Sequence, residues 1–155
     1  VLLVAGCSPQ HPEKRWPIEK FRELAAKLIR QGITPVLIGT KAEADTNATI
    51  TRGMEICDLS GKTDLFDIPD LARNAICAIG NDTGPMHMAA ASGCPVVMLF
   101  SQIASKLELH APPDYKTNTH VVCFEAPEIG DINVKDVFDA CLRICKKAPL
   151  NQTAI

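Results

Sequence analysis

The chain has 155 residues, 46% of them apolar, so it is long enough to bury one sizeable core, and a single domain is the default expectation. A formal net charge of −2 gives no sign of the basic surface that nucleic-acid binding requires, and nucleic acid is not an expected partner. No stretch approaches the roughly 20 consecutive apolar residues of a membrane-spanning helix, so no transmembrane segment is expected.

Along the chain, short apolar runs typical of buried strands alternate with segments whose apolar residues recur at helical spacing. Apolar residues at helical spacing predict a helix that opens at Pro17. It should end at Gly32, where a left-handed residue is usual. Residues 101–115 contain two consecutive prolines and are predicted as a loop with room for one helical turn. The predicted strands are 1–6, 35–39, 54–59, 75–79, 95–100 and 121–124, and the other predicted helices are 41–52, 65–74, one opening at Pro85 and one capped by Asn133.

The two ends of the chain and its cysteines bear on its setting. Residues 1–6 lack the basic region and the length of a signal peptide. The chain opens without a Met inside an apparent strand, so we expect it to be part of a longer protein. We expect one domain over residues 1–148 and a frayed tail over residues 149–155.

The seven cysteines are odd in number and lack C-x-x-C spacing, which favours a reducing, cytoplasmic setting. Cys141 and Cys145 share a helix face, where core packing is the favoured interpretation and metal binding is the alternative.

Strands that are apolar throughout and alternate with helices are typical of a parallel sheet covered on both faces. The predicted fold class is therefore α/β, with a Rossmann-like parallel sheet. In such sheets, ligands bind at the carboxyl ends of the strands, near the point where the strand order reverses. The loops of interest are 7–16, 39–43, 60–64, 81–85 and 101–114.

The turn after the fourth predicted strand is a candidate anion site. Pro85 suits the first turn of a helix, and the N–H groups at a helix N-terminus bind anions such as phosphate. Gly84 allows a ligand close to the backbone, and the Thr83 hydroxyl can donate a hydrogen bond. Asp82 would repel phosphate, so we expect it to accept from turn N–H groups or from ligand hydroxyls. The alternative is a well-capped helix with a buried His87, which could otherwise face the phosphate.

Other loops on the same rim supply complementary groups. Lys14 and Arg15 bring the positive charge that a diphosphate requires, unless they form a solvated basic pair. Glu43 follows the second strand, where an acidic residue can hold a ribose, although an exposed Glu in a first helical turn is equally consistent. There is no G-x-G-x-x-G or P-loop motif, and no cluster of Asp or His suggests a metal, so neither a cofactor nor a metal is predicted.

Taken together, four ordered motifs resemble glycosyltransferase family 9, the ADP-heptose:lipopolysaccharide heptosyltransferases. The resemblance covers most of residues 1–100. The motifs are Lys14-Arg15-Trp16-Pro17-x-x-x-Phe21, Pro35-Val36-Leu37-Ile38-Gly39 with Glu43, Asp58-Leu59-Ser60-Gly61, and Asp82-Thr83-Gly84-Pro85-Met86-His87.

The resemblance implies a GT-B architecture of two Rossmann-like domains, of which this chain would be the carboxyl-terminal, donor-binding half. By its motif positions, Lys14 would meet the donor diphosphate and Glu43 the ribose. The adenine would lie near Leu65 or Phe66, with Phe66 as our candidate. The remaining candidates for donor binding are Asp82, Thr83 and Gly84 in the turn, His87 just beyond it, and Ser8 as a donor to phosphate.

The resemblance also implies inverting transfer of a sugar from a nucleotide-sugar donor to a lipid A/core saccharide acceptor. The general base of that family is an aspartate of the amino-terminal domain, so we assign no catalytic residue here and expect this chain alone to be inactive. Lys14 and the turn amides would stabilise the leaving diphosphate. The full-length enzyme would work in the cytoplasm, at the inner face of the inner membrane.

Two loops depart from the family pattern. Residues 101–106 replace the usual Gly-Pro-Thr loop, which leaves the donor sugar and the acceptor open, and residues 7–11 differ from the usual Gly-Ala-Ser type. Two alternatives therefore stand beside the heptosyltransferase hypothesis. One is a stand-alone nucleotide-binding module without transfer chemistry, and the other is a domain of another GT-B enzyme, such as a sugar-nucleotide epimerase.

Overall fold

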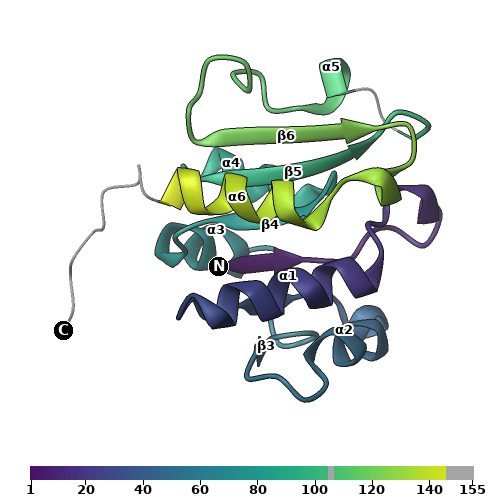
Figure 1. Ribbon diagram of the computed structural model, residues 1–155, viewed down its shortest axis with the longest axis vertical. Helices are drawn as coiled ribbons and strands as arrows, with labels where there is room; N and C mark the ends of the chain where they lie inside the picture. Colours follow the sequence, from purple (N-terminus) through teal and green to yellow (C-terminus); the bar gives the residue numbers. More distant parts are fainter. Residues whose placement is uncertain (105–106, 146–155) are drawn as a thin grey trace.

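Six short strands pair in parallel to form the central sheet of the computed structural model, which describes residues 1–104 and 107–145 (Figure 1). The strands are β1 (Leu2–Val4), β2 (Val36–Ile38), β3 (Cys57–Asp58), β4 (Ala78–Asn81), β5 (Val96–Ser101) and β6 (Val121–Ala126). The helices are α1 (Ile18–Arg30), α2 (Ala44–Thr51), α3 (Asp67–Asn74), α4 (Gly84–Ala91), α5 (Leu107–His110) and α6 (Val134–Cys145), and short 3-10 helices cover Pro12–Lys14, Lys41–Glu43 and Ile129–Asp131. The predicted α/β class is confirmed.

The strand order is β3-β2-β1-β4-β5-β6. The chain runs from β1 outward to β3, returns to the other side of β1 at β4, and continues outward to β6. Leu2 pairs with Val36 on one side and with Ala78 on the other, so β1 lies at the centre of the sheet. The order therefore reverses between β1 and β4, the position at which sheets of this type bind ligands.

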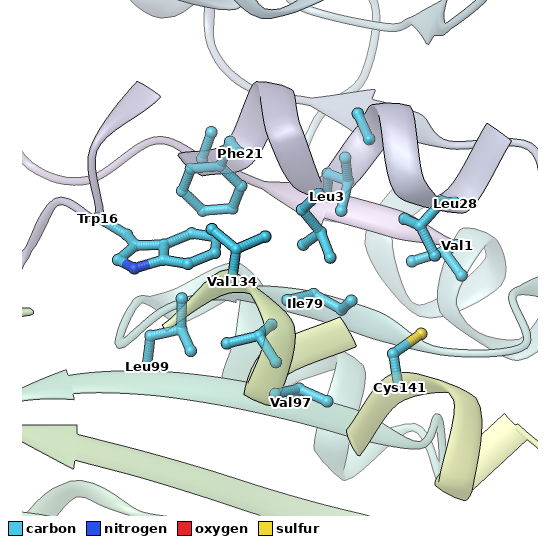
Figure 2. Packing of buried hydrophobic residues seen from close by; sticks show 14 of the residues in the cluster. Val1, Leu3, Trp16, Phe21, Leu28, Ile79, Val97, Leu99, Val134 and Cys141 are labelled. Carbon is cyan, nitrogen blue, oxygen red and sulfur yellow. The ribbon is translucent and has the colours of Figure 1, made fainter. Parts of the chain in front are cut away.

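Alternate residues of each strand enter two separate hydrophobic cores. Leu3 and Ile79 point to the face covered by α1 and α6, where they pack with Phe21 and Leu28 (Figure 2). Leu2 and the other residues of the opposite set meet α3 and α4 on the second face. Since both faces are covered, the strands are apolar throughout, as expected for a parallel sheet.

Helix α1 owes its place to one apolar stripe and to a defined stop. Phe21, Leu24 and Leu28 are buried on the sheet side, as the helical spacing predicts. The Trp16 ring packs edge-on against Phe21, with centroids 5.0 Å apart. Gly32 follows the helix with a φ of 71°, which confirms the left-handed stop predicted from the sequence.

Several predicted bounds shift in the structure. The third strand is shorter than residues 54–59, because only Cys57 and Asp58 find partners on β2. The helix predicted over residues 65–74 begins at Asp67, since the Asp64 carboxylate accepts the N–H groups of Phe66 and Asp67 and forms a turn there. Helix α5 confirms the single helical turn within residues 101–115. The predicted domain boundary at residue 148 and the predicted tail lie outside the described residues.

Among the residues that the structure describes, no helix combines the length and the apolar character needed to cross a membrane.

Candidate functional site

A cavity of about 660 Å³ lies at the carboxyl ends of β1, β2 and β4, where the strand order reverses. The loops after β1, β2, β3 and β4 all contribute to its walls, as the topology predicts, whereas no described residue of the fifth predicted loop, 101–114, lines it. Its volume is in the range of sites that hold small molecules. The polar and charged residues on its walls include Ser8, Lys14, Arg15, Thr40, Glu43, Thr46, Thr63, Asp64, Asp82 and Thr83.

Lys14, Asp82 and His87 form a chain of side-chain contacts at this cavity. The Lys14 Nζ donates to Asp82 Oδ2 at 2.8 Å, and His87 Nε2 lies 2.8 Å from Asp82 Oδ1. The side chains of Lys14 and Asp82 are only 16% and 5% exposed. Lys14 is therefore held in a nearly buried ion pair and is not the solvated residue that the sequence left open, whereas Arg15 is exposed.

The N-terminus of α4 opens toward the same space. Thr83 is its N-cap residue, with extended backbone (φ −147°, ψ 159°), and makes no side-chain capping bond. The Thr83 hydroxyl instead donates to the carbonyl of Asn81 at 3.3 Å. Pro85 stands in the first helical turn, as predicted. Pro85 has no N–H, and the Met86 and His87 N–H groups donate to the Thr83 carbonyl, so the donors that this helix start offers a ligand are the amides of Thr83 and Gly84. The helix dipole favours an anion there.

Glu43 lies across the ends of β1 and β2. Its Oε2 accepts from the N–H and the hydroxyl of Thr40 at 2.7 and 2.9 Å, which forms a capping box for the 3-10 helix Lys41–Glu43. Its other oxygen packs over Gly6, where even a methyl group would lie only 1.7 Å from Oε1. Glu43 is thus a half-buried first-turn residue on the cavity wall, and its contact with a ribose stays a prediction.

Asn81 is a positioning residue that the sequence analysis did not single out. It is fully buried at the end of β4, where its Oδ1 accepts from the N–H of Trp16 at 3.0 Å. Its Nδ2 donates to the carbonyls of Ala5 at 2.9 Å and Gly6 at 3.3 Å. Asn81 thereby joins the end of β1, the end of the Lys14 loop and the turn before α4. A polar residue that closes an apolar strand was the available signal.

Trp16 anchors the other end of the Lys14 loop. Its indole N–H donates to the carbonyl of Ile132 at 3.1 Å, and its ring is buried beside Phe21 and Val134 (Figure 2). Arg15 is fixed as well, because its guanidinium donates to the carbonyl of Cys7 at 3.0 Å. Both contacts restrict the loop that carries Lys14 before any ligand arrives.

Cys7 is the thiol on the cavity wall. Burial raises the pKa of the Cys7 thiol, and the charges of Lys14 and Arg15 oppose that rise only in part. Its Sγ donates to the carbonyl of His11 at 3.6 Å. The thiol is therefore protonated near neutral pH and is not poised as a nucleophile.

The structure gathers six of the eight predicted site residues on the cavity wall: Ser8, Lys14, Glu43, Asp82, Thr83 and Gly84. His87 is not among the lining residues, but it contacts the Oδ1 atom of the Asp82 carboxylate. Phe66 is 88% exposed and does not line the cavity, whereas Leu65 does. The two sequence alternatives for this position thus separate, because Phe66 lies off the face of α3 that Ile68 and Ala72 bury.

A comparison of the sequence with models of protein families agrees with the fold and with the position of the cavity in the sheet. The sequence model described as glycosyltransferase family 9 (heptosyltransferase) matches residues 1–137. The chain belongs to this family.

Curated relatives and solved structures agree with that assignment. This family 9 chain is 33% identical over 108 residues to lipooligosaccharide heptosyltransferase 2 of Haemophilus influenzae, an alignment that covers 66% of the chain and 30% of the relative. It is 34% identical over 95 residues to lipopolysaccharide heptosyltransferase 2 of Escherichia coli, which covers 57% and 27%. The chain thus spans less than a third of the length of these relatives.

Two solved Escherichia coli proteins share the fold. ADP-heptose LPS heptosyltransferase II superposes with a TM-score of 0.81 at 24% identity, over 94% of the family 9 chain and 46% of the solved one. Heptosyltransferase WaaC, solved with ADP, gives a TM-score of 0.78 at 20% identity, over 92% and 43%. At these identities the superpositions establish the fold alone, and they match the chain to less than half of each structure.

Proposed function

We propose that this chain is the donor-binding domain of a heptosyltransferase that takes heptose from ADP-heptose and transfers it, with inversion, to a lipopolysaccharide core acceptor. One observation carries the proposal: the cavity at the switch point is walled by the N-terminus of α4, by Lys14 and by Glu43. Family membership supports the reaction class, and the names of the relatives support the sugar and the acceptor.

The diphosphate would bind at the N-terminus of α4. The amides of Thr83 and Gly84 would donate to its oxygens, because a helix N-terminus combines unpaired donors with a favourable dipole. Ser8 lines the same cavity and can add a hydroxyl donor. Lys14 supplies the full positive charge that a diphosphate requires.

The nucleoside would extend toward β2 and α3. Glu43, held by Thr40 at the end of β2, would accept from ribose hydroxyls. Leu65 and Ile68 give the cavity an apolar wall on this side, suited to a base. Phe66 remains our candidate for contact with the adenine, reached by a turn of its exposed side chain toward the cavity mouth.

Asp82 and His87 would position Lys14 and the sugar. The Asp82 carboxylate pairs with the Lys14 ammonium at 2.8 Å, which fixes the ammonium at the cavity wall. An arriving diphosphate competes for the same ammonium. His87 keeps Asp82 in place from its other oxygen, so the carboxylate stays available to sugar hydroxyls and does not follow Lys14.

In the transfer step, the acceptor oxygen forms a bond to the anomeric carbon while the bond from that carbon to the β-phosphate oxygen breaks. The electron pair leaves on ADP, and the acceptor proton goes to a general base. We place that base in an amino-terminal domain outside this chain, together with the acceptor site, in a protein that works at the cytoplasmic face of the inner membrane. The task of this chain is to stabilise the charge that grows on the departing diphosphate.

The experiment that tests the proposal is a calorimetric titration of the purified protein with ADP, UDP and GDP. We expect ADP to bind and the other two to bind more weakly, with ADP-heptose binding at least as well as ADP. Equal binding of all three nucleotides would refute an ADP-sugar site. No binding of any of them would refute the assignment of the cavity.

A further inference from the structure

Three cysteines meet near the amino end of β4, at the opposite end of this strand from the cavity. Cys77 directly precedes β4, and Cys141 and Cys145 lie on the last turns of α6. Their sulfur atoms all lie within 4.8 Å of one another, and those of Cys141 and Cys145 are 3.8 Å apart. Figure 2 shows the Cys141 sulfur in the core between α6 and the sheet. Cys77 comes from a distant part of the sequence, so the fold alone brings the third thiol to the helical pair.

We propose that Cys77, Cys141 and Cys145 form a three-thiolate site for a soft cation, Cu(I). Thiolate ligands select soft ions such as Cu(I) and Zn(II) over hard ones. At a metal–sulfur distance of about 2.3 Å, three sulfurs around one ion are spaced about 4 Å apart. The observed spacing reaches this value if the sulfurs move inward by less than about 1 Å, which side-chain rotation alone can supply.

The number and the surroundings of the ligands favour Cu(I) over Zn(II). Structural zinc sites are almost always four-coordinate, whereas the cluster within residues 1–104 and 107–145 consists of three cysteines with no His, Asp or Glu. Cys77 and Cys141 belong to the apolar core, and Cys145 packs against it. Burial of this kind leaves little room for water as a fourth ligand, so three-coordinate Cu(I) fits the site.

Two local charges act on a cation at this position with opposite sign: the Val1 ammonium, which interacts with all three cysteines, and the C-terminal end of α6. The three sulfurs lie at the C-terminal end of α6, where the helix dipole carries partial negative charge. Because metal ligands are thiolates, an incoming cation displaces protons from these thiols to solvent.

The test is a Cu(I) titration of the reduced protein under anaerobic conditions, in competition with the chromogenic chelator bicinchoninate. We expect one equivalent to bind, with three sulfur neighbours at about 2.3 Å by X-ray absorption. Cys77→Ser and Cys145→Ser should each weaken binding on the order of 100-fold or more, beyond the roughly 10–100-fold that loss of an outer-shell partner costs.

Cys94→Ser is the matched control. Cys94 is buried just ahead of β5, and its Sγ donates to the carbonyl of the next residue at 3.4 Å, as that of Cys77 does. It lies outside the three-sulfur cluster, so its replacement should leave Cu(I) affinity unchanged while it imposes a similar cost on the core. Circular dichroism of each variant checks that the fold persists.

Alkylation of the unaltered protein gives an answer even where a variant fails to fold. Cu(I) should protect the half-buried Cys145 from iodoacetamide and leave the exposed Cys57 reactive, as read by peptide mass spectrometry. Four findings would each overturn the proposal: less than one bound equivalent, unchanged affinity in both cluster variants, oxygen or nitrogen neighbours in the absorption spectrum, or equal protection of Cys57. A cluster that only packs the core would give the first of these.

Discussion

Gly6→Ala tests whether Glu43 depends on the empty space above β1. A methyl group at Gly6 would lie 1.7 Å from Glu43 Oε1 and 2.3 Å from Cδ, and no such contact can persist. The backbone at Gly6 is not the obstacle, because its φ is not among the positive values found at glycines in the described residues. Since the clashing atoms end a flexible side chain, we expect the carboxylate to rotate outward while β1 stays in place.

The cost follows from the bonds that this rotation breaks. Glu43 would give up the hydrogen bonds from the Thr40 N–H and hydroxyl, at 2.7 and 2.9 Å. Both bonds are exposed, so water replaces part of each, and the loss of the capping box should cost about 1–2 kcal/mol. In a domain of this size, that lowers the melting temperature by roughly 3–6 °C. Nucleotide affinity should fall as well, because the proposed ribose ligand has moved.

A double-mutant cycle separates this mechanism from general damage. In a Glu43→Ala background the obstacle is gone, so adding Gly6→Ala should cost less than about 0.5 kcal/mol further. Gly130→Ala is the control, because its added methyl group would meet Pro17 at 3.7 Å, an ordinary contact. Melting curves by circular dichroism and calorimetry with ADP are the assays. Equal costs of Gly6→Ala in the two backgrounds would refute the reasoning.

Three further predictions follow from the site and the core. Lys14→Ala should weaken ADP binding by about 1–3 kcal/mol in calorimetry, while the exposed control Lys135→Ala should not; equal affinities would remove Lys14 from the site. Asn81→Ala should lower the free energy of unfolding, measured in urea, by about 2–4 kcal/mol, since the buried Trp16 N–H and Ala5 carbonyl lose their partner. A change below about 0.5 kcal/mol, as is usual for a surface substitution, would contradict this. Burial raises the pKa of Cys123 to about 12, so its alkylation at pH 8 should be far slower than that of the exposed Cys57 and should accelerate as the pH approaches that value; comparable rates at pH 8 would contradict it.

The sequence predicted the parallel sheet because each strand leaves a local trace. An apolar run bounded by turn residues is visible without knowledge of its neighbours, and Gly32 marks a helix end by its own conformational freedom. The strand order leaves no such local trace in the sequence, because it depends on which strands pair in space. Only the general rule that ligands bind at the carboxyl ends of such sheets allowed the relevant loops to be chosen in advance.

The candidate site shows the same limit at the level of side chains. Ser8, Lys14, Glu43 and the turn around Asp82 were predicted by residue type and position, and the structure brings them to one cavity. The ion pair between Lys14 and Asp82 was not predicted, since it joins residues far apart in the sequence. Leu65 and Phe66 could not be separated either, because neighbouring residues at a helix start point in different directions and only the packing of α3 decides between them.

The hydrogen bond between Asn81 and Trp16 gives the protein a built-in optical probe. Trp16 is the sole tryptophan of the chain, so all indole emission comes from a ring one residue away from the Lys14–Arg15 pair. A nucleotide that draws Lys14 away from Asp82 pulls on the peptide segment that holds this ring. If a nucleotide binds as proposed, intrinsic fluorescence should follow its occupancy of the cavity, with no label attached and no change to the residues that line it.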